Sequence, residues 1–246
     1  MERRESVAAD DAEGLEAGDV ASGGAPRITH AMEDYLKSVY RLQTQDDSVT
    51  TQHLAEELRI SGPSVTNMVK RLHDLRLVEY APYHGVRLTS TGEKIALEVI
   101  RHHRLLELYL AQTLGYPWDE VHAEAERLEH HVSDELEERI DSALGYPTRD
   151  PHGDPIPSPD GEIAAVSPTL LLDLPPDRSG VVVRVSDRDA EALRYFGELG
   201  LRPGATVVVV DRSASGGPLK VRIAGEVYEL SRRLAAVVHV GMAEAP

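Results

Sequence analysis

The sequence of 246 residues contains no cysteine, and this absence excludes both disulfide bonds and thiolate metal sites. Long apolar runs are missing as well. No stretch approaches the ~20 apolar residues that a membrane-spanning helix needs, and residues 1–26 lack the apolar core of a secretion signal. We therefore expect a cytoplasmic protein that has no membrane partner.

The net charge of −16 argues against a nucleic-acid partner until its distribution is considered. Residues 27–90 carry eight acidic and eight basic side chains, whereas residues 91–150 carry fourteen acidic and six basic ones. Only the balanced segment can approach phosphate. The acidic segment that follows repels itself unless cations neutralise it, which is a first indication of bound metal.

Residues 27–90 show the pattern of a winged helix-turn-helix domain. A first stretch of apolar residues at helical spacing is followed by a second helix, which Thr50 or Thr51 can cap. A turn containing Gly62 then leads into a third helix that begins at Pro63. Two short strands close the segment. This order favours DNA binding, and the alternative is a generic helical bundle with a hairpin.

The rest of the chain predicts further helices and a small β domain, so the fold class is mostly α with a small β part. Helices are predicted over 91–112 and 118–144, and their exposed faces suggest dimerisation. Eight prolines between residues 145 and 178 indicate a linker. The predicted units are a disordered acidic tail (1–26), the winged-helix domain (27–90), a helical metal-binding and dimerisation domain (91–150), a proline-rich linker (151–178) and a five-stranded barrel (179–243).

Histidines and carboxylates occur at ligand spacing on both long helices. The first offers a His-x-x-x-Glu pair, and the second a histidine followed one turn later by Glu-x-x-Glu-His, all on one helical face. Solvated surface charges are the alternative, but two helices of an acidic segment both offer ligands. The candidate ligands are His103, Glu107, His122, Glu126, Glu129 and His130.

Two other functions could use such features. A carboxylate-bridged metal site can belong to an enzyme, but the sequence has no nucleophile motif, no glycine-rich phosphate loop and no His-Glu-x-x-His. We therefore predict no enzymatic activity. A winged-helix regulator that senses a small organic ligand would need apolar sensor positions, whereas the candidate positions here are ionisable.

Seven ordered stretches carry a resemblance to a known family. They are MEDYL (32–36), SGPSVT (61–66), LTSTG (88–92), HHRL (102–105), VH (121–122), ERLEH (126–130) and HGDPIP (152–157). From about residue 28 to 243 the chain resembles the metal-dependent repressors typified by diphtheria toxin repressor and the manganese regulator of bacilli. The resemblance implies a homodimer that binds palindromic double-stranded operator DNA, with one or two dimers on each operator, and an SH3-like (FeoA-like) carboxy-terminal domain.

The resemblance also implies two metal sites in each subunit. One ion at the primary site would tie the first helix of the DNA-binding domain to the dimerisation helix. The primary site falls on Asp34, Glu126, Glu129 and His130. The ancillary site falls on His103, Glu107, His122 and a ligand from the barrel, for which Asp189 aligns best and Glu191 is the neighbouring alternative.

The primary ligands also bear on the choice of metal. In iron-responsive members of the family, the positions of Asp34 and Glu126 are typically Met and Cys. Oxygen ligands with one imidazole suit Mn²⁺, so we expect a Mn²⁺-dependent repressor that controls metal homeostasis, with an Fe²⁺-dependent repressor of iron uptake as the alternative. Lys37 stands where the bacillary manganese regulators have an additional Glu, which argues against a binuclear site of that kind.

The start of the third helix of the winged-helix domain is expected to enter a DNA groove. Ser61 also suits a helix cap and Pro63 a first helical position, so each has a structural role beside the predicted contact. Contacts with base edges are predicted for Ser61, Pro63, Ser64 and Asn67, and contacts with phosphate for Thr51, Thr66, Lys70 and Arg71.

Overall fold

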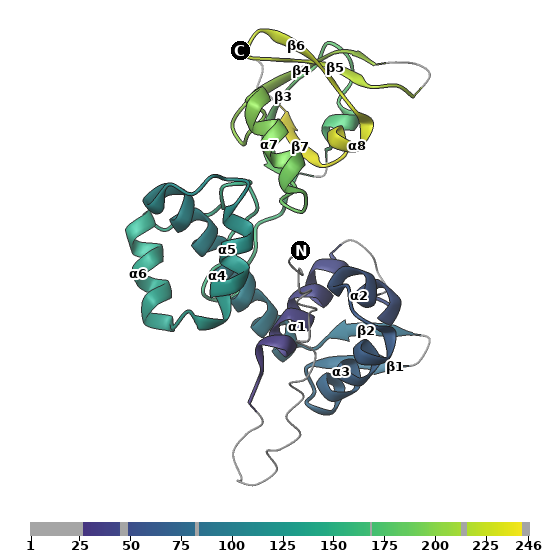
Figure 1. Cartoon of the computed structure of the whole chain (residues 1–246), viewed down its shortest axis with the longest axis vertical. Helices are drawn as coiled ribbons and strands as arrows, with labels where there is room; N and C mark the ends of the chain where they lie inside the picture. Colours follow the sequence, from purple (N-terminus) through teal and green to yellow (C-terminus); the bar gives the residue numbers. More distant parts are fainter. Residues whose placement is uncertain (1–26, 45–48, 82–83, 168, 213–215, 243–246) are drawn as a thin grey trace, which may run out of the picture.

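A computed structural model describes residues 27–44, 49–81, 84–167, 169–212 and 216–242. The acidic tail predicted for 1–26 lies outside the described residues. The described part of the chain forms three successive units, each with a hydrophobic core of its own (Figure 1). Within those residues, no helix has the length and apolar character that crossing a membrane requires.

The first unit is the predicted winged helix-turn-helix. Helices α1 (His30–Gln43), α2 (Thr51–Leu58) and α3 (Gly62–Asp74) precede a hairpin of β1 (Val78–Ala81) and β2 (Gly85–Leu88). The two strands pair antiparallel. The apolar stripe of each helix faces a shared core, which contains Met32, Leu36, Val39, Leu54, Val65, Val69 and Leu72.

Capping fixes the turn between α2 and α3. Thr50, not Thr51, caps α2 by accepting a hydrogen bond from the His53 amide. The helix is followed by Arg59, whose φ of 56° lies in the left-handed region and turns the chain sharply. Ser61 then caps α3 by accepting from the Ser64 amide. These contacts set the direction of α3 relative to α2.

The second unit contains α4 (Ser90–Leu114), α5 (Val121–Leu128), a 3₁₀ turn η1 (Glu129–His131) and α6 (Asp134–Leu144). The prediction of one helix over 118–144 is therefore wrong. Val132 is extended, and the Ser133 side chain caps a new helix by accepting from the Leu136 amide. Acidic residues in the first turn of α6 favour its start because they face the positive end of the helix dipole.

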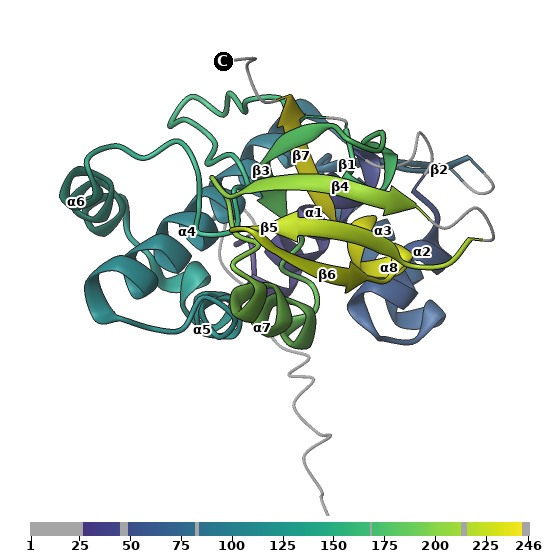
Figure 2. The ribbon, with the colours of Figure 1, turned by 90° about the horizontal axis from the view of Figure 1, so that it is seen from above.

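The third unit is a five-stranded antiparallel sheet curled around one core, the SH3-like domain that was predicted. Its strand order is β6-β5-β4-β3-β7 (Figure 2). The elements are β3 (Ser179–Val185), α7 (Ala190–Leu199), β4 (Thr206–Arg212), β5 (Leu219–Ile223), β6 (Glu226–Leu230), α8 (Arg232–Ala235) and β7 (Val238–Met242). Buried and exposed residues alternate along β5, the period of two that a strand shows when one of its faces lies on a core.

The proline-rich segment 151–178 is only partly a connection. Ile156 is buried against the second unit. Near its other end, Leu171 of the 3₁₀ turn η2 (Leu171–Asp173) and the following Leu174 are buried in the core of the third unit. Both ends of the predicted linker therefore pack on the domains that they join.

The third unit is attached to the second through the turn at residues 150–155. The Val185 amide donates to the His152 carbonyl at 2.8 Å, and the Arg184 guanidinium pairs with Asp154. Gly153 adopts φ +91°, and a Cβ there would lie 2.0 Å from the Val183 carbonyl oxygen. Only glycine permits this close approach. The attachment brings the loop after β3 to the face of α4.

Candidate metal centre and DNA interface

Two adjoining groups of acidic and histidine side chains lie where the three units meet. The junction cluster consists of Asp34 from α1 together with Glu129 and His130 from η1. The inter-domain cluster consists of His103 and Glu107 from α4, His122 from α5, and Asp187 from the loop after β3. In each cluster one ligand atom per residue lies within 4.8 Å of the others, the arrangement that a metal ion requires.

In the junction cluster, the His130 ring lies between carboxylates on both sides. Its Nε2 is 3.0 Å from Asp34 Oδ1 and 3.5 Å from Glu129 Oε1. Its Nδ1 is 2.6 Å from Glu33 Oε2, and a carboxylate at this nitrogen fixes the ring and directs Nε2 toward the other two acids. Sequence analysis did not identify Glu33, because its adjacency to Asp34 gave no reason to expect a contact with His130.

Glu126, the fourth predicted primary ligand, points to a different partner. Its Oε1 accepts a hydrogen bond from Lys37 Nζ at 2.7 Å, and Lys37 also donates to both oxygens of Glu129 at 2.6 and 2.8 Å. The structure thus brings together Asp34, Glu129 and His130. Glu126 lies beside them, hydrogen-bonded to Lys37. The Lys37 ammonium lowers the pKa of Glu126 against the opposing effect of burial.

Glu129 connects the two clusters. Its side chain is fully buried, and its Oε2 is 2.5 Å from His103 Nδ1. Burial alone would raise the pKa of Glu129, but the hydrogen bond with His103 and the nearby charges of His103 and Lys37 lower it to about 2. This carboxylate is therefore anionic throughout the physiological pH range and available to a cation.

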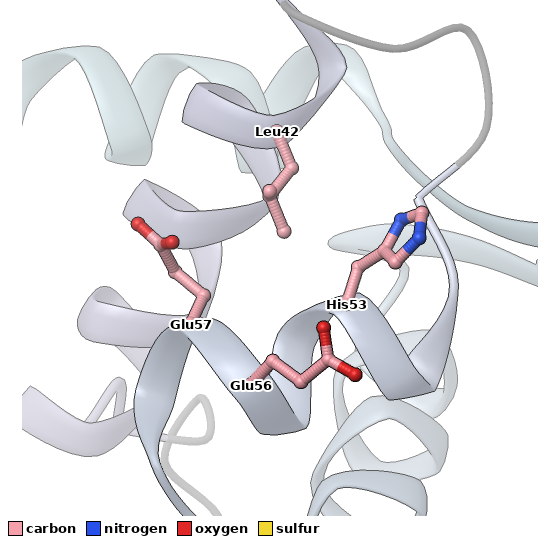
Figure 3. A pocket seen from close by; sticks show the side chains of 4 residues that line it. All are labelled: Leu42, His53, Glu56 and Glu57. Carbon is pink, nitrogen blue, oxygen red and sulfur yellow. The ribbon is translucent and has the colours of Figure 1, made fainter. Parts of the chain in front are cut away.

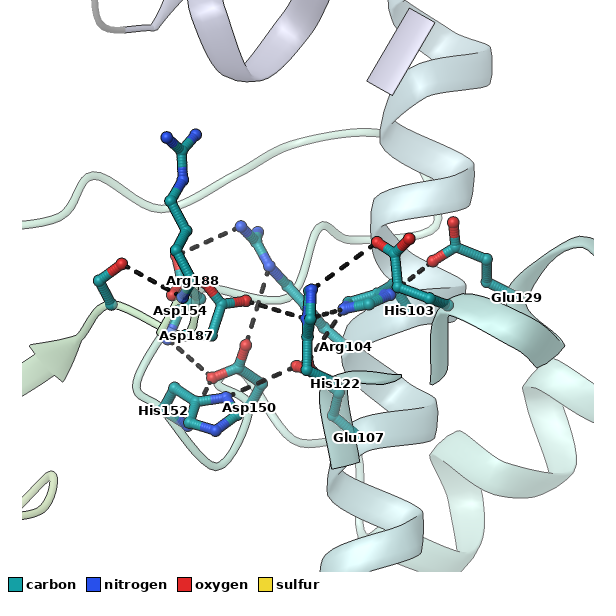
Figure 4. Close-up of polar contacts among 12 residues, drawn as sticks. His103, Arg104, Glu107, His122, Glu129, Asp150, His152, Asp154, Asp187 and Arg188 are labelled. Carbon is teal, nitrogen blue, oxygen red and sulfur yellow. Dashed lines mark hydrogen bonds and ion pairs between the residues drawn. The ribbon is translucent and has the colours of Figure 1, made fainter. Parts of the chain in front are cut away.

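The inter-domain cluster is centred on Glu107 (Figure 4). Its Oε1 is 2.9 Å from His103 Nε2 and 3.1 Å from His122 Nδ1, and His122 Nδ1 is 3.3 Å from Asp187 Oδ2. Burial opposes the charge on His103, but the Glu107 carboxylate and its hydrogen bond raise the pKa of His103 to about 9. Without a metal, a proton on the imidazole therefore balances the buried carboxylate.

The barrel residue in this cluster is Asp187, not the predicted Asp189. The Asp189 carboxylate caps α7 by accepting from the Ala192 amide and also pairs with Arg233, and it does not belong to the cluster. The neighbouring alternative, Glu191, is exposed in the first turn of α7. The sequence contained one signal for this correction, because an Asp that directly precedes a helix is a preferred cap.

A third buried histidine, His152, lies close to Glu107. His152 Nε2 donates to the Trp118 carbonyl at 2.7 Å, and its Nδ1 is 3.8 Å from Glu107 Oε2 (Figure 4). Burial opposes a charge on His152, but Glu107 and Asp150 raise its pKa to about 9. His152 had been noted only as part of a turn motif, and its approach to Glu107 depends on the packing of that turn against α4.

The comparisons with known proteins cover all three units. Residues 27–86 match the family model of the N-terminal DNA binding domain of iron dependent repressors, and residues 89–158 match that of their metal binding and dimerisation domain. Residues 169–241 match the FeoA domain. The iron-dependent repressor IdeR of Mycobacterium leprae (strain TN) is 34% identical over 226 residues, which cover 87% of this chain and 97% of the relative. The chain belongs to this family of metal-dependent repressors.

Other members support the same assignment. Diphtheria toxin repressor of Corynebacterium diphtheriae is 32% identical over 223 residues, covering 87% of this chain and 97% of the relative. A solved manganese-dependent transcriptional repressor in complex with manganese is 39% identical, with a TM-score of 0.81 over 86% of this chain and 100% of that one. The predicted family, fold class and repressor function are confirmed, and iron-dependent and manganese-dependent repressors both occur among these relatives.

The repressor's α3 helix lies at the end of the molecule opposite the β domain (Figure 1). Lys70 and Arg71 add positive charge to its exposed side. The Thr66 hydroxyl already donates to the Gly62 carbonyl, so a contact with phosphate would require it to exchange that partner. Thr51 is half-buried at the first position of α2. The predicted contact residues that are exposed on or beside α3 are Ser61, Pro63, Ser64, Asn67, Lys70 and Arg71.

A hollow between α1 and α2 bears on the organic-ligand alternative. Leu42 points into it, and His53, Glu56 and Glu57 form the rest of its lining (Figure 3). Three of these four side chains are ionisable. The hollow therefore does not supply the apolar lining that an organic effector would need.

Proposed function

We propose that Mn²⁺ switches this repressor to its operator-binding form by binding to the junction cluster. The observation that carries the proposal is the meeting of ligands from two units: Asp34 on α1 lies 3.0 Å from His130 of η1, with Glu129 beside them. A divalent ion held by these residues would be bonded to ligands of both units at once. Glu126, which adjoins the cluster, is the candidate for a fourth ligand.

The position of Asp34 on α1 explains how such a site could control DNA binding. Met32 and Leu36, on the same helix, are buried in the core that also holds α3. Any constraint on Asp34 therefore acts on the orientation of α3. Ligands shared between the units would narrow the range of orientations, and the metal would shift the population toward the binding form by its preference for that arrangement.

The DNA side of the proposal follows from the exposed face of α3. We assign base contacts to Ser61, Pro63, Ser64 and Asn67, and phosphate contacts to Thr51, Thr66, Lys70 and Arg71. In a two-fold dimer, two copies of α3 would read half-sites about 34 Å apart or a multiple of this distance, which implies a palindromic operator. The relatives' names describe repressors, and we propose no catalytic role for the chain.

We assign a second cation in each subunit to the inter-domain cluster. His103, Glu107 and His122 provide two imidazoles and a fully buried carboxylate, and Asp187 adds a second carboxylate from the β domain. Glu107 Oε2 has no hydrogen-bond partner among the described residues, although it is fully buried. The donors thus fit a divalent ion, and this ion would hold the β domain against the helical domain.

The donor atoms also support the choice of metal. Both clusters offer only carboxylate oxygens and imidazole nitrogens, which suit Mn²⁺, whereas thiolate ligands would favour more thiophilic metals. Fe²⁺ is the alternative, since relatives of this chain are named iron-dependent repressors. Geometry and metal supply then decide between the two, because intrinsic affinity at such sites increases from Mn²⁺ to Fe²⁺.

Metal-dependent operator binding tests the proposal directly. Operator affinity should be measured for the wild type, Asp34→Ala and the control Glu229→Ala, which alters an exposed acid on β6, at rising Mn²⁺, anaerobic Fe²⁺ or Zn²⁺. We expect Mn²⁺ to activate the wild type and the control at low concentration, and Asp34→Ala to need far more. Unchanged activation of Asp34→Ala would refute the junction cluster as the switch.

A further inference from the structure

Lys37 is a buried cation inside the metal centre. The residue is 4% exposed, and its Nζ lies within 2.8 Å of one oxygen of Glu126 and both oxygens of Glu129. Lysine is almost never buried to this extent unless it is paired. Its position on α1, three residues after Asp34, places both side chains on the face of α1 that meets η1.

The Lys37 ammonium lies within a second group of side chains that could bind a metal ion. Glu129 belongs to two such groups: Asp34, Glu129 and His130 form one, and His103, Glu126 and Glu129 form the other. Lys37 Nζ contacts both carboxylates of the second group. The second group therefore already contains a positive charge, which is attached to α1 through the lysine side chain.

The charges of the two groups lead to the same conclusion. The two groups contain the carboxylates of Asp34, Glu126 and Glu129, and the Lys37 ammonium offsets one of their three negative charges. One divalent ion can bind Asp34, Glu129 and His130 without displacing the ammonium. A second divalent ion would have to displace the ammonium from two carboxylates and leave it buried without a partner, which is strongly unfavourable.

We propose that Lys37 is a built-in counter-ion that takes the place of a second metal and limits the junction to one divalent ion. This inference rests on the proposed function, because it presupposes that the junction cluster binds Mn²⁺. It assigns to Lys37 the role of a residue that determines metal stoichiometry. The lysine also holds Glu126 and Glu129 in position before the metal binds.

Metal counting in charge variants tests the proposal. The background His122→Ala/Asp187→Ala weakens the inter-domain cluster, and bound Mn²⁺ per subunit is measured by equilibrium dialysis with Lys37, Lys37→Arg or Lys37→Glu in that background. Lys37→Arg keeps the charge and should leave the count unchanged. Lys37→Glu removes the ammonium and adds a ligand, so the count should rise by one. The two ions should then show the coupled paramagnetic resonance spectrum of neighbouring Mn²⁺ ions.

An unchanged count in Lys37→Glu would overturn the role of Lys37, whereas a wild type without Mn²⁺ at the junction would refute the proposed function itself. Lys37→Met provides a test that does not depend on Lys37→Glu folding. With metal removed by chelator, it should unfold at a lower temperature than the wild type, because Glu129 loses its buried counter-ion. Mn²⁺ should then raise its unfolding temperature by more than that of the wild type. Equal unfolding temperatures of the two metal-free proteins would overturn the proposal.

Discussion

Replacing each of the two candidate aspartates of the β domain in turn shows which of them is the metal ligand: Asp187, which the structure places in the inter-domain cluster, or Asp189, which the sequence resemblance favoured. Asp187→Asn removes a carboxylate that lies 3.3 Å from His122 in the inter-domain cluster, whereas Asp189→Asn alters the cap of α7 and leaves the cluster intact. The amide keeps the size of the side chain in both variants. Any difference in metal affinity between them therefore reports on the charge of one ligand.

The expected size of the effect follows from the contacts. Loss of a group that merely supports a ligand typically costs 10–100-fold in metal affinity, so removal of a direct ligand should cost Asp187→Asn at least about tenfold, or about 1.4 kcal/mol. The Asp189 side chain makes a single hydrogen bond at the cap and one exposed ion pair. Because asparagine caps helices about as well as aspartate, its replacement should have little effect on the stability of the β domain and leave metal affinity unchanged.

Isothermal titration calorimetry with Mn²⁺ measures this comparison, and chemical unfolding of the metal-free proteins provides the control. Asp187→Asn should weaken one class of sites and leave the junction site unaffected. Loss of metal affinity in Asp189→Asn, with Asp187→Asn unchanged, would restore the alignment-based assignment and refute the structural reasoning. Equal loss in both variants would point to a general weakening of the β domain instead.

Three further predictions concern pH, DNA and domain docking. The raised pKa values of His103 and His152, about 9 against 6.5, mean that their charged forms stabilise the metal-free protein fully below pH 6.5. This stabilisation, on the order of 3 kcal/mol, should be lost as the pH rises through 9, and denaturant unfolding in chelator should lose this pH dependence in Glu107→Gln. Lys70→Ala should weaken binding to all DNA sequences alike and lower the salt dependence by about one phosphate contact. In electrophoretic mobility assays with operator variants, Asn67→Ala should instead relax specificity at one base pair by about 1–3 kcal/mol. Gly153→Ala should loosen the β domain in limited proteolysis, because its Cβ would collide with the Val183 carbonyl. Gly204→Ala, with the same φ of about +90° but open space around it, is the matched control.

Local patterns in the sequence determined the order of the domains and many of the candidate ligands. Helical spacing of apolar residues predicted α1 to α4, and short β-rich stretches separated by glycine turns predicted the strands of the β domain. The ligand spacing on α4 and around Glu126 to His130 is likewise local, because residues three or four apart share a helical face. The break at Val132 was missed, since the serine cap that starts α6 interrupts a run of residues that otherwise looks helical.

Only the tertiary structure decided which groups meet across the three units. Lys37 lies 89 residues from Glu126, and His122 meets Asp187 through the docking of the β domain on the turn around Gly153. Such contacts cannot be predicted from the spacing of residues in the sequence, because they depend on the directions in which whole helices and domains pack. The contact of Asp187 with His122 and the buried charge of Lys37 thus became visible only once burial and long-range neighbours were known, and these define the candidate metal centre.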